Sequence, residues 1–279
     1  MVTGGSGSLG THLIKELTRR GVKDITSISR DEGLIREAER EVGAPNVRFL
    51  VGDICDPKAM NTILDGVDVV YHAAAMKHVS IAEKNPREVL RINVLGTLNI
   101  LDHAKGLDLF INISSDKAIG VTNCYGSSKL LAEYLVEETS RIFLGKFINI
   151  RCPNFLASRE SVLDNWMRTI RKTNTIRLTD PTMTRYFITM HDAAKFIVDT
   201  STRHDLSPNE RYYPLEQTRK FRLGDLAQAF VRVYGNGQTR IETIGKQPGE
   251  KLHEDYIADV RFDTVEGLEK VLRDTIGSL

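Results

Sequence analysis

Short apolar runs rich in β-branched residues alternate with amphipathic segments over the first two thirds of the chain. Five of these runs predict strands, at residues 24–29, 47–51, 67–73, 109–114 and 147–150. Several are apolar at consecutive positions, as expected for parallel strands that helices cover on both faces. Between them, apolar residues recur at helical spacing in residues 9–20, 88–104 and 126–142. This alternation predicts an α/β fold with a doubly wound, right-handed parallel sheet.

The pattern changes after about residue 151, where loops become longer and five prolines punctuate them. Short predicted strands (175–178, 211–213, 240–244) mix with predicted helices (192–200, 223–233, 265–274). We therefore expect a first domain at residues 1–150. Residues 151–279 are expected to form a smaller mixed α/β lobe, partly interleaved with the sheet.

Composition narrows the function classes. Hydrophobic residues make up 41% of the chain and charged residues 27%, which excludes a disordered protein. Lys and Arg number 38 and Asp and Glu 37, so the net charge of +1 argues against non-specific binding to nucleic acid or anionic membranes. No apolar run approaches the ~18 residues of a membrane span, and no signal peptide is evident. A cytoplasmic protein without membrane or nucleic-acid partners is expected.

The three cysteines, Cys55, Cys124 and Cys152, are far apart. They form no C-x-x-C pair, so neither a metal site nor a disulfide framework is indicated. Idle thiols in a reducing compartment are the expectation.

A glycine-rich segment opens the chain directly before the first predicted helix. Glycines 4, 7 and 10 give the spacing G-x-x-G-x-x-G, which provides a tight turn and a close backbone approach to a pyrophosphate. The helix N-terminus adds N–H donors. The residues expected to bind a dinucleotide here are Thr3, Gly4, Ser6, Gly7, Ser8, Leu9 and Gly10. Only two residues precede the segment, so either the first strand is two residues long or the numbering begins inside it.

Polar residues follow the second and third predicted strands. Ser29, Arg30 and Asp31 occupy the position where an acid binds the ribose of NAD and an arginine suits the 2′-phosphate of NADP. Arg30 therefore favours NADP, with NAD as the alternative; a solvated arginine, with Asp31 or Glu32 capping the next helix, would give the same pattern. Asp53 is placed to accept from the adenine amino group, or else to cap a turn or helix.

Tyr125 and Lys129 form Y-x-x-x-K at the start of a predicted helix, on one face. A lysine ammonium beside a phenol lowers the phenol's pKa, so the tyrosine can take a hydroxyl proton as hydride leaves the same carbon. The motif alone is common by chance. It gains weight from the glycine segment and from Ser114 and Ser115 on the preceding strand.

At this point the chain resembles the extended short-chain dehydrogenases/reductases, and within them the UDP-N-acetylglucosamine 4,6-dehydratases of the polysaccharide-biosynthesis branch. The resemblance covers nearly the whole chain. It rests on residues 2–10 (VTGGSGSLG), 29–32 (SRDE), 52–56 (GDICD), 72–79 (HAAAMKHV), 93–97 (NVLGT), 114–118 (SSDKA), 125–129 (YGSSK), 183–186 (MTRY) and 248–254 (PGEKLHE). It implies a Rossmann-type fold, bound NADP, a UDP-sugar substrate and a homo-oligomer.

The resemblance also implies the chemistry. Besides Ser115, Tyr125 and Lys129, a dehydratase needs two acid/base groups near C5 and C6 of the sugar, and Asp116 and Lys117 match them. Lys117, if neutral, removes the C5 proton, and Asp116, if protonated, donates to the departing C6 oxygen. Their roles can be exchanged, and a plain ion pair in a loop is the alternative. The tyrosine at position 125 matches the branch that inverts C5.

Further binding residues follow from the matched segments alone. For the cofactor these are Ile54, Ala73, Ala74, Ala75, Lys77 and Asn93. For the substrate, expected to be UDP-N-acetylglucosamine, they are Lys77, His78, Asn154, Arg159, Arg185, Glu250 and Lys251. The chain departs from the family pattern at Cys152-Pro153, Glu160 and Gln247, which puts the exact sugar nucleotide in doubt. A UDP-hexosamine 4- or 5-epimerase and a non-catalytic NADP-binding protein remain as alternatives.

Overall fold

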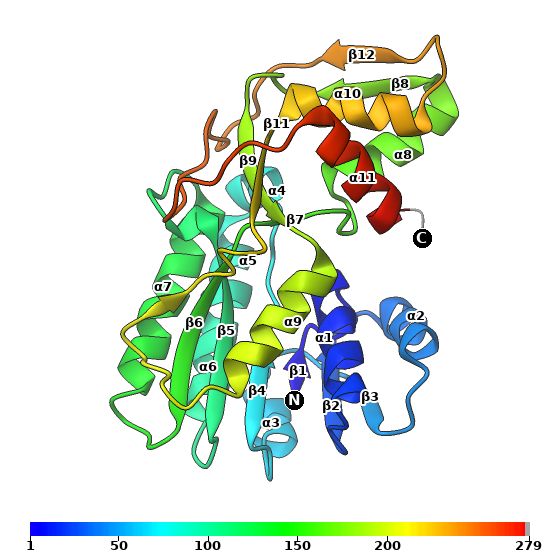
Figure 1. Cartoon of the computed structure of the whole chain (residues 1–279). Helices are drawn as coiled ribbons and strands as arrows, with labels where there is room; N and C mark the ends of the chain where they lie inside the picture. Colours follow the sequence, from blue (N-terminus) through cyan, green and yellow to red (C-terminus); the bar gives the residue numbers. More distant parts are fainter. Residues whose placement is uncertain (277–279) are drawn as a thin grey trace. The chain divides into compact units, whose positions relative to one another are not determined.

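The computed structural model describes residues 1–276, which form two compact units (Figure 1). The first unit consists of residues 1–152 and 191–214, and the second of residues 153–190 and the chain from residue 215 onward. Residues 191–214, which the sequence analysis placed in a partly interleaved second lobe, thus supply one helix and one strand to the first unit.

A seven-stranded parallel sheet is the centre of the first unit, in the order β10-β6-β5-β4-β1-β2-β3. The strands are β1 (Val2–Thr3), β2 (Ile25–Ser29), β3 (Val47–Val51), β4 (Val69–His72), β5 (Leu109–Ser115), β6 (Lys146–Cys152) and β10 (Arg211–Tyr212). Every residue of β2 and β5 is buried, as their continuous runs predicted. The doubly wound sheet is confirmed, and β1 is two residues long between β2 and β4.

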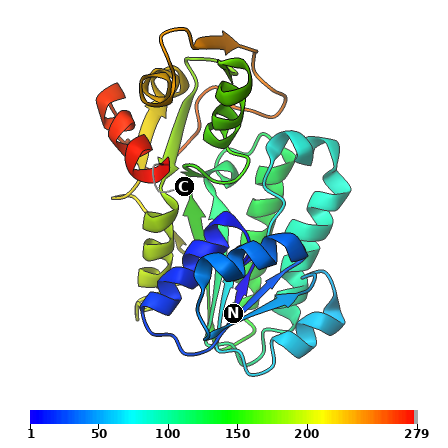
Figure 2. The same cartoon turned by 90° about the vertical axis from the view of Figure 1, so that its right-hand side faces the viewer.

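Helices cover both faces of this sheet (Figure 2). On one face α1 (Ser8–Arg19) packs against α2 (Glu32–Val42), and an ion pair between Arg20 and Asp199 joins the end of α1 to α9 (Met190–Ser201). On the other face α6 (Gly96–Asp102) contacts both α3 (Pro57–Ile63) and α7 (Cys124–Thr139). In sheets of this kind, ligands bind to the loops that follow the carboxyl ends of the strands.

The helix predicted at residues 88–104 is interrupted. The chain forms α4 (Val79–Lys84) and α5 (Pro86–Val89), then a π-helical segment, η1 (Leu90–Leu95), before α6. The apolar pattern did not reveal the wider π-turn, because it preserves the buried face: Ile92, Asn93 and Val94 are all buried. Such π-turns frequently occur at functional sites, and this one carries Asn93.

The second unit contains two small sheets. One has the order β11-β9-β7, formed by β7 (Asn154–Phe155), β9 (Thr184–Ile188) and β11 (Arg219–Arg222). The other pairs β8 (Thr175–Leu178) with β12 (Arg240–Thr243) in parallel. The helices are α8 (Val162–Thr173), α10 (Leu223–Tyr234) and α11 (Val265–Ile276). The sequence analysis missed β7, β9, β11 and α8.

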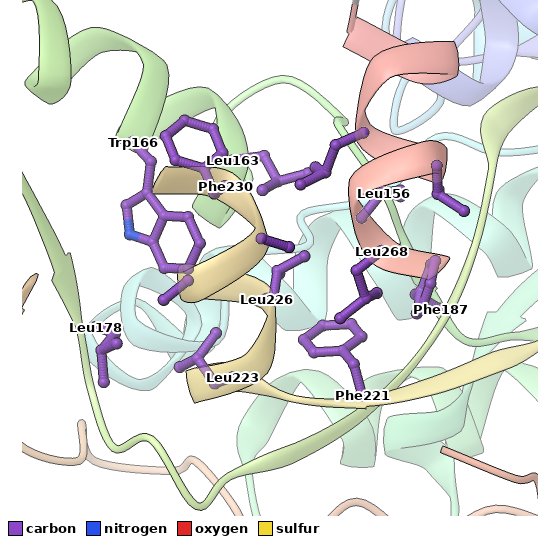
Figure 3. Close-up of a cluster of buried hydrophobic side chains, with 14 of the residues drawn as sticks. Leu156, Leu163, Trp166, Leu178, Phe187, Phe221, Leu223, Leu226, Phe230 and Leu268 are labelled. Carbon is purple, nitrogen blue, oxygen red and sulfur yellow. The ribbon is translucent and has the colours of Figure 1, made fainter. Parts of the chain in front are cut away.

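An aromatic and aliphatic core holds the second unit together (Figure 3). The fully buried Trp166 of α8 packs edge-on against Phe230 of α10 at 5.3 Å between ring centroids. Phe187 of β9 meets Phe221 of β11 in the same way at 5.0 Å. Among the residues described, no helix combines the length and apolar character required to cross a membrane.

Candidate active site

The glycine-rich segment forms a tight turn between β1 and α1. Gly4 has a left-handed backbone, with φ of +68°, and a Cβ there would lie 2.8 Å from the Ala74 backbone. A Cβ on Gly10 would lie 2.2 Å from the Gly4 carbonyl oxygen. Gly7 is the N-cap of α1 and offers no side chain to its first turn. The backbone N–H groups in the first turn of α1 can therefore face an anionic ligand, and the glycine turn fits a dinucleotide pyrophosphate.

A buried histidine links this turn to the neighbouring strand and helix. His72 Nδ1 lies 2.7 Å from Thr3 Oγ1, and its Nε2 lies 2.9 Å from Thr97 Oγ1. Thr97 Oγ1 donates its proton to the Asn93 carbonyl at 2.8 Å, so His72 Nε2 carries a hydrogen and Nδ1 accepts from Thr3. Burial lowers the pKa of His72 to about 3. The sequence analysis assigned no role to His72 or Thr97.

The next two strand ends carry the residues expected near the adenosine. Arg30 is exposed at the end of β2, and the side chain of Asp31 caps α2 by accepting from Leu34 N at 2.8 Å. Ser29 Oγ accepts from Ser6 N at 3.1 Å, which ties β2 to the glycine turn. Ile54 is buried beside Asp53.

Asp53 lies at the end of β3 and is held by two donors. Its Oδ1 accepts from Cys55 N at 3.0 Å and its Oδ2 from Arg91 Nη1 at 3.1 Å. Burial raises the pKa of Asp53, but these hydrogen bonds outweigh burial and hold the pKa below its usual range. Arg91 is a residue that the sequence analysis missed, since no motif marks it.

Residues 73–78 follow β4 and are fixed by Asn93. Ala73 N donates to the Thr3 carbonyl at 3.2 Å and Ala74 N to Thr3 Oγ1 at 3.3 Å. The Asn93 side chain accepts from Met76 N at 2.7 Å and donates to the Met76 carbonyl and Ser128 Oγ, both at 2.9 Å. It therefore connects this loop, which includes Ala75, Lys77 and His78, to the helix bearing Tyr125.

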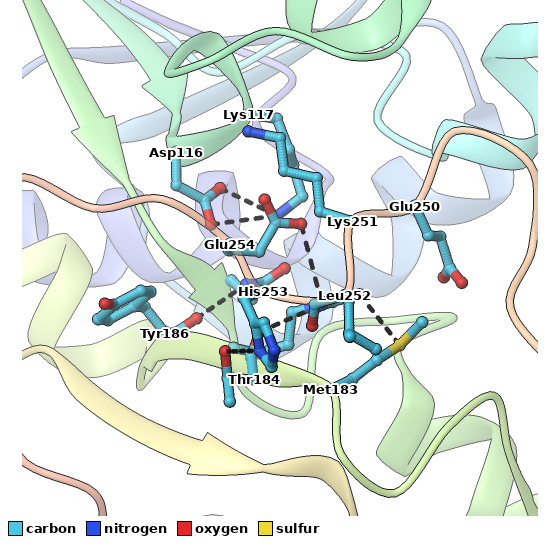
Figure 4. A network of polar contacts seen from close by, with 12 residues as sticks. Asp116, Lys117, Met183, Thr184, Tyr186, Glu250, Lys251, Leu252, His253 and Glu254 are labelled. Atoms are coloured by element: carbon cyan, nitrogen blue, oxygen red, sulfur yellow. Dashed lines mark hydrogen bonds and ion pairs between the residues drawn. The ribbon is translucent and has the colours of Figure 1, made fainter.

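Tyr125, Ser115, Asp116 and Lys117 form one line of polar contacts. The Ser115 side chain lies close enough to Tyr125 to lower its pKa, and Ser115 Oγ donates to Asp116 Oδ1 at 2.8 Å. Lys117 Nζ donates to the same carboxylate oxygen at 2.9 Å (Figure 4). Asp116 is fully buried. The pairing of Asp116 with Lys117 is the ion pair named above as the alternative, and it lies directly beside the predicted catalytic tyrosine.

The start of α7 packs closely against this line. Asn123 Oδ1 caps the helix by accepting from Gly126 N at 2.8 Å. A Cβ on Gly126 would lie only 2.2 Å from the Lys117 carbonyl oxygen. A glycine directly after Tyr125 is thus required for α7 to approach the turn that carries Asp116 and Lys117.

Burial dominates the protonation of the tyrosine and lysine. It raises the pKa of Tyr125 well above its usual value, and the Ser115 side chain offsets this only in part. The expectation of a lowered Tyr125 pKa is therefore wrong for the protein by itself. Burial lowers the pKa of Lys129 to about 8, with Glu133 acting in the opposite direction. Cys152, also buried, has its pKa raised by burial to about 12 and is a neutral packing group.

One turn after Lys129, the buried Glu133 joins four elements. It accepts from Ser114 Oγ at 2.5 Å, from Arg151 Nη2 at 2.7 Å and from Arg211 Nε at 3.2 Å. These partners lie on β5, β6 and β10. The sequence analysis missed this cluster, because its members are far apart in the chain.

The remaining predicted residues lie in the second unit, where protein partners hold them. Arg185 Nη1 donates to the Thr184 carbonyl at 2.9 Å, and Nε lies 3.9 Å from Glu254. Asn154 Nδ2 donates to the Tyr186 carbonyl at 2.8 Å. Lys251 pairs with Asp255 at 2.7 Å.

Two loops carry the other predicted substrate residues of this unit. Glu250 accepts from Gln247 N at 3.1 Å. Arg159 precedes Glu160, whose backbone is left-handed with φ of +60°. Neither the Glu250 contact nor the backbone at Glu160 indicates a ligand by itself. The substrate-binding roles of Glu250 and Arg159 therefore stay predictions.

Comparison with known proteins gives the family. A family model described as polysaccharide biosynthesis protein matches residues 1–274. The chain belongs to this family. A UDP-N-acetylglucosamine 4,6-dehydratase (inverting) of Campylobacter jejuni is 34% identical over 265 residues, which are 92% of this chain and 77% of that protein. This agrees with the resemblance to extended short-chain dehydrogenases/reductases.

Other relatives differ in length and description. An uncharacterized membrane protein of Methanocaldococcus jannaschii is 34% identical over 96% of this chain and 83% of its own. The chain spans less than half, 44%, of the probable polysaccharide biosynthesis protein EpsC of Bacillus subtilis, at 31% identity. Among solved structures, Pen from Bacillus thuringiensis matches with a TM-score of 0.85 and 29% identity, over 91% of this chain and 81% of that one.

Proposed function

We propose that the protein is a nucleotide-sugar 4,6-dehydratase that converts UDP-N-acetylglucosamine, with inversion at C5. The observation that carries this proposal is the line Tyr125–Ser115–Asp116–Lys117. It joins the group that removes a hydroxyl proton to an acid/base pair suited to water elimination. The similarity to the inverting dehydratase supports the same reaction.

The glycine turn, Arg30 and Asp53 fit a nicotinamide dinucleotide, with Arg30 favouring NADP. A cofactor held by these residues would supply the hydride chemistry of the reaction, acceptance from C4 of the sugar and return to C6. Tyr125 receives the C4 hydroxyl proton, and the Ser115 side chain, which lies beside it and lowers its pKa, positions the tyrosine. Burial raises the pKa of Tyr125, so the phenolate would need the positive charge of the oxidised nicotinamide in addition to that of Lys129, which is protonated below about pH 8.

Asp116 and Lys117 perform the elimination. The proton of Lys117 Nζ lies on a 2.9 Å hydrogen bond to Asp116 Oδ1. Its transfer leaves a neutral amine and a carboxylic acid, which are the forms the reaction requires. The amine then takes the C5 proton, acidified by the C4 ketone, and the acid donates to the departing C6 oxygen. A pair that is hydrogen-bonded beforehand needs no other proton source.

The substrate's UDP portion is assigned to the second unit. Arg185 is the candidate for the diphosphate, because a guanidinium matches phosphate oxygens in a bidentate manner. Asn154, Arg159, Glu250 and Lys251 are proposed to contact the remaining uridine and sugar groups. Lys77 and His78 of the first unit are assigned to the sugar side, since they follow β4 at the carboxyl edge of the sheet.

We also propose a homo-oligomer. Four large apolar side chains of the first unit, on the contacting segments η1 and α7, are about half exposed: Leu90 at 48%, Leu95 at 50%, Leu131 at 45% and Tyr134 at 55%. Burial of such residues against a second copy would remove apolar surface from water.

The deciding experiment is incubation with UDP-N-acetylglucosamine in D₂O, followed by mass spectrometry and proton NMR. The expected product is lighter by one water and carries deuterium at an inverted C5. Loss of water with the original C5 configuration would retain the reaction class and contradict inversion. A product of unchanged mass would instead establish an epimerase. Absence of any product while NADP stays bound would contradict this substrate.

A further inference from the structure

Arg91, on η1, connects two carboxylates beside the end of β3. Its Nε and Nη2 atoms donate to the two oxygens of Glu88 at 3.0 and 2.7 Å, and its Nη1 donates to Asp53 at 3.1 Å. The bidentate contact with Glu88 fixes the plane of the guanidinium. Cys55 Sγ donates to the Arg91 carbonyl at 3.2 Å, which ties the backbone of Arg91 to the same turn. Arg91 is therefore held by both its backbone and its side chain.

This arrangement fixes the direction of the Asp53 carboxylate. Cys55 N occupies one oxygen and Arg91 the other, so rotation of the carboxylate would break one of the two contacts. A carboxylate has about four acceptor positions, so the contacts with Cys55 and Arg91 leave the Asp53 carboxylate capacity for a further donor. The Asp53 side chain is 32% exposed, so such a donor can reach it.

We propose that Arg91 is a positioning residue that, acting through Asp53, makes the first unit select a dinucleotide whose purine carries an amino group. Adenine presents an N–H donor to the fixed carboxylate. Hypoxanthine presents a carbonyl oxygen at the same position, and two acceptors facing each other repel. This inference rests on the proposed function only in that the first unit binds a nicotinamide dinucleotide.

The test is a competition for binding, which needs no turnover. The full chain is incubated with equal amounts of NADP⁺ and its deamino form, in which hypoxanthine replaces adenine. After gel filtration, the retained nucleotides are measured by liquid chromatography and mass spectrometry. The wild-type protein should retain the adenine form in roughly tenfold excess, the effect of one hydrogen bond to a charged group.

Arg91→Gln should bring this ratio close to one, whereas total retention changes less. Glu88→Gln keeps the contact between Arg91 and Asp53 but weakens the hold on the guanidinium, so its ratio should lie between the two. This second variant serves if Arg91→Gln does not fold. Arg48 is an exposed arginine on β3, the strand that precedes Asp53. Arg48→Gln is therefore the matched control and should retain the wild-type ratio.

A wild-type ratio near one, or a wild-type ratio preserved in Arg91→Gln, would overturn the inference and leave the proposed function standing. Equal loss of both nucleotides in Arg91→Gln and Glu88→Gln would assign Arg91 a purely structural role and overturn it as well. A wild-type protein that retains neither nucleotide would contradict the proposed function itself.

Discussion

The ammonium group of Lys117 donates to both carboxylate oxygens of Asp116, at 2.9 and 3.2 Å. If this pair carries the elimination, Lys117→Met should lower the rate of water loss by about 100- to 10,000-fold, the usual contribution of a general base. Tyr125 is retained in this variant, so C4 oxidation should persist. It is observable as a rise in absorbance at 340 nm when UDP-N-acetylglucosamine is added.

Tyr125→Phe is the matched comparison, because it should abolish both the absorbance change and water loss. Deuterium at C5 of recovered sugar separates the steps in Lys117→Met. Undiminished incorporation of deuterium in that variant would show that another group removes the C5 proton.

The buried Lys129 should make stability depend on pH. Its pKa is lowered by burial to about 8 in the folded protein, from 10.5. Between these values the unfolded chain binds more protons, so this group makes the protein more stable as the pH rises from about 8 to 10.5. In Lys129→Met this contribution to the slope should vanish, and at pH 7 the variant should be more stable, by at most about 3 kcal/mol.

Chemical denaturation at a series of pH values measures this slope. Lys15→Met removes an exposed lysine and should leave the slope as in the wild type. A Lys129→Met protein that keeps the wild-type slope between pH 8 and 10.5 would refute the assignment.

At acidic pH, the stability of the protein should depend on His72. Its pKa is lowered by burial from 6.5 to about 3, so the unfolded chain binds more protons between these values. Stability should therefore fall as the pH decreases from about 6.5 towards 3. His72→Asn should flatten this decline. At pH 7 it should cost about 1–3 kcal/mol, because the hydroxyls of Thr3 and Thr97 lose their buried partner.

Thermal melts of His72→Asn at pH 5 and pH 7 test this expectation, with the exposed His204→Asn as the control. Equal acid sensitivity of His72→Asn and the wild type would contradict it.

Glu133 is buried against the partly buried Arg151 and Arg211, and Arg211 has a second partner in Glu137, so neutralising Glu133 deprives Arg151 in particular of its carboxylate. Glu133→Gln should lower the free energy of unfolding by about 3–5 kcal/mol, as measured by urea denaturation. Glu41→Gln, in an exposed ion pair with Lys15, should change it by less than about 1 kcal/mol. Comparable losses in the two variants would show that the Glu133 cluster contributes little.

The proposed homo-oligomer depends on the exposed side chains of η1 and α7. Leu131→Asp should reduce the molar mass measured by light scattering to that of one 31.3 kDa chain without lowering the melting temperature of the monomer. Leu144→Asp alters a fully exposed leucine in the loop after α7 and should leave the mass unchanged. A wild-type protein that is itself monomeric would refute the proposal.

Prediction from the sequence succeeded where neighbouring residues carry the information. The glycine segment, Y-x-x-x-K and the strands of the parallel sheet depend on local spacing and periodicity, and the structure has them within a few residues of the expected bounds. The strands β7, β9 and β11 were missed, because they are short and only partly apolar. The π-turn η1 was missed because it keeps the buried face of an ordinary helix.

The sequence by itself determined the α/β class, the glycine turn and the presence of Ser115, Asp116, Lys117, Tyr125 and Lys129. Only the tertiary structure decided the pKa shifts of these residues and their hydrogen-bond partners. Burial raises the pKa of Tyr125 where spacing predicted the reverse, and the buried Asp116 forms an ion pair with the partly buried Lys117. His72, Arg91 and Glu133 gain their partners only through the sheet, which brings residues distant in the chain within hydrogen-bonding distance. Desolvation and such long-range contacts depend on what surrounds each group, and a one-dimensional pattern does not contain that information.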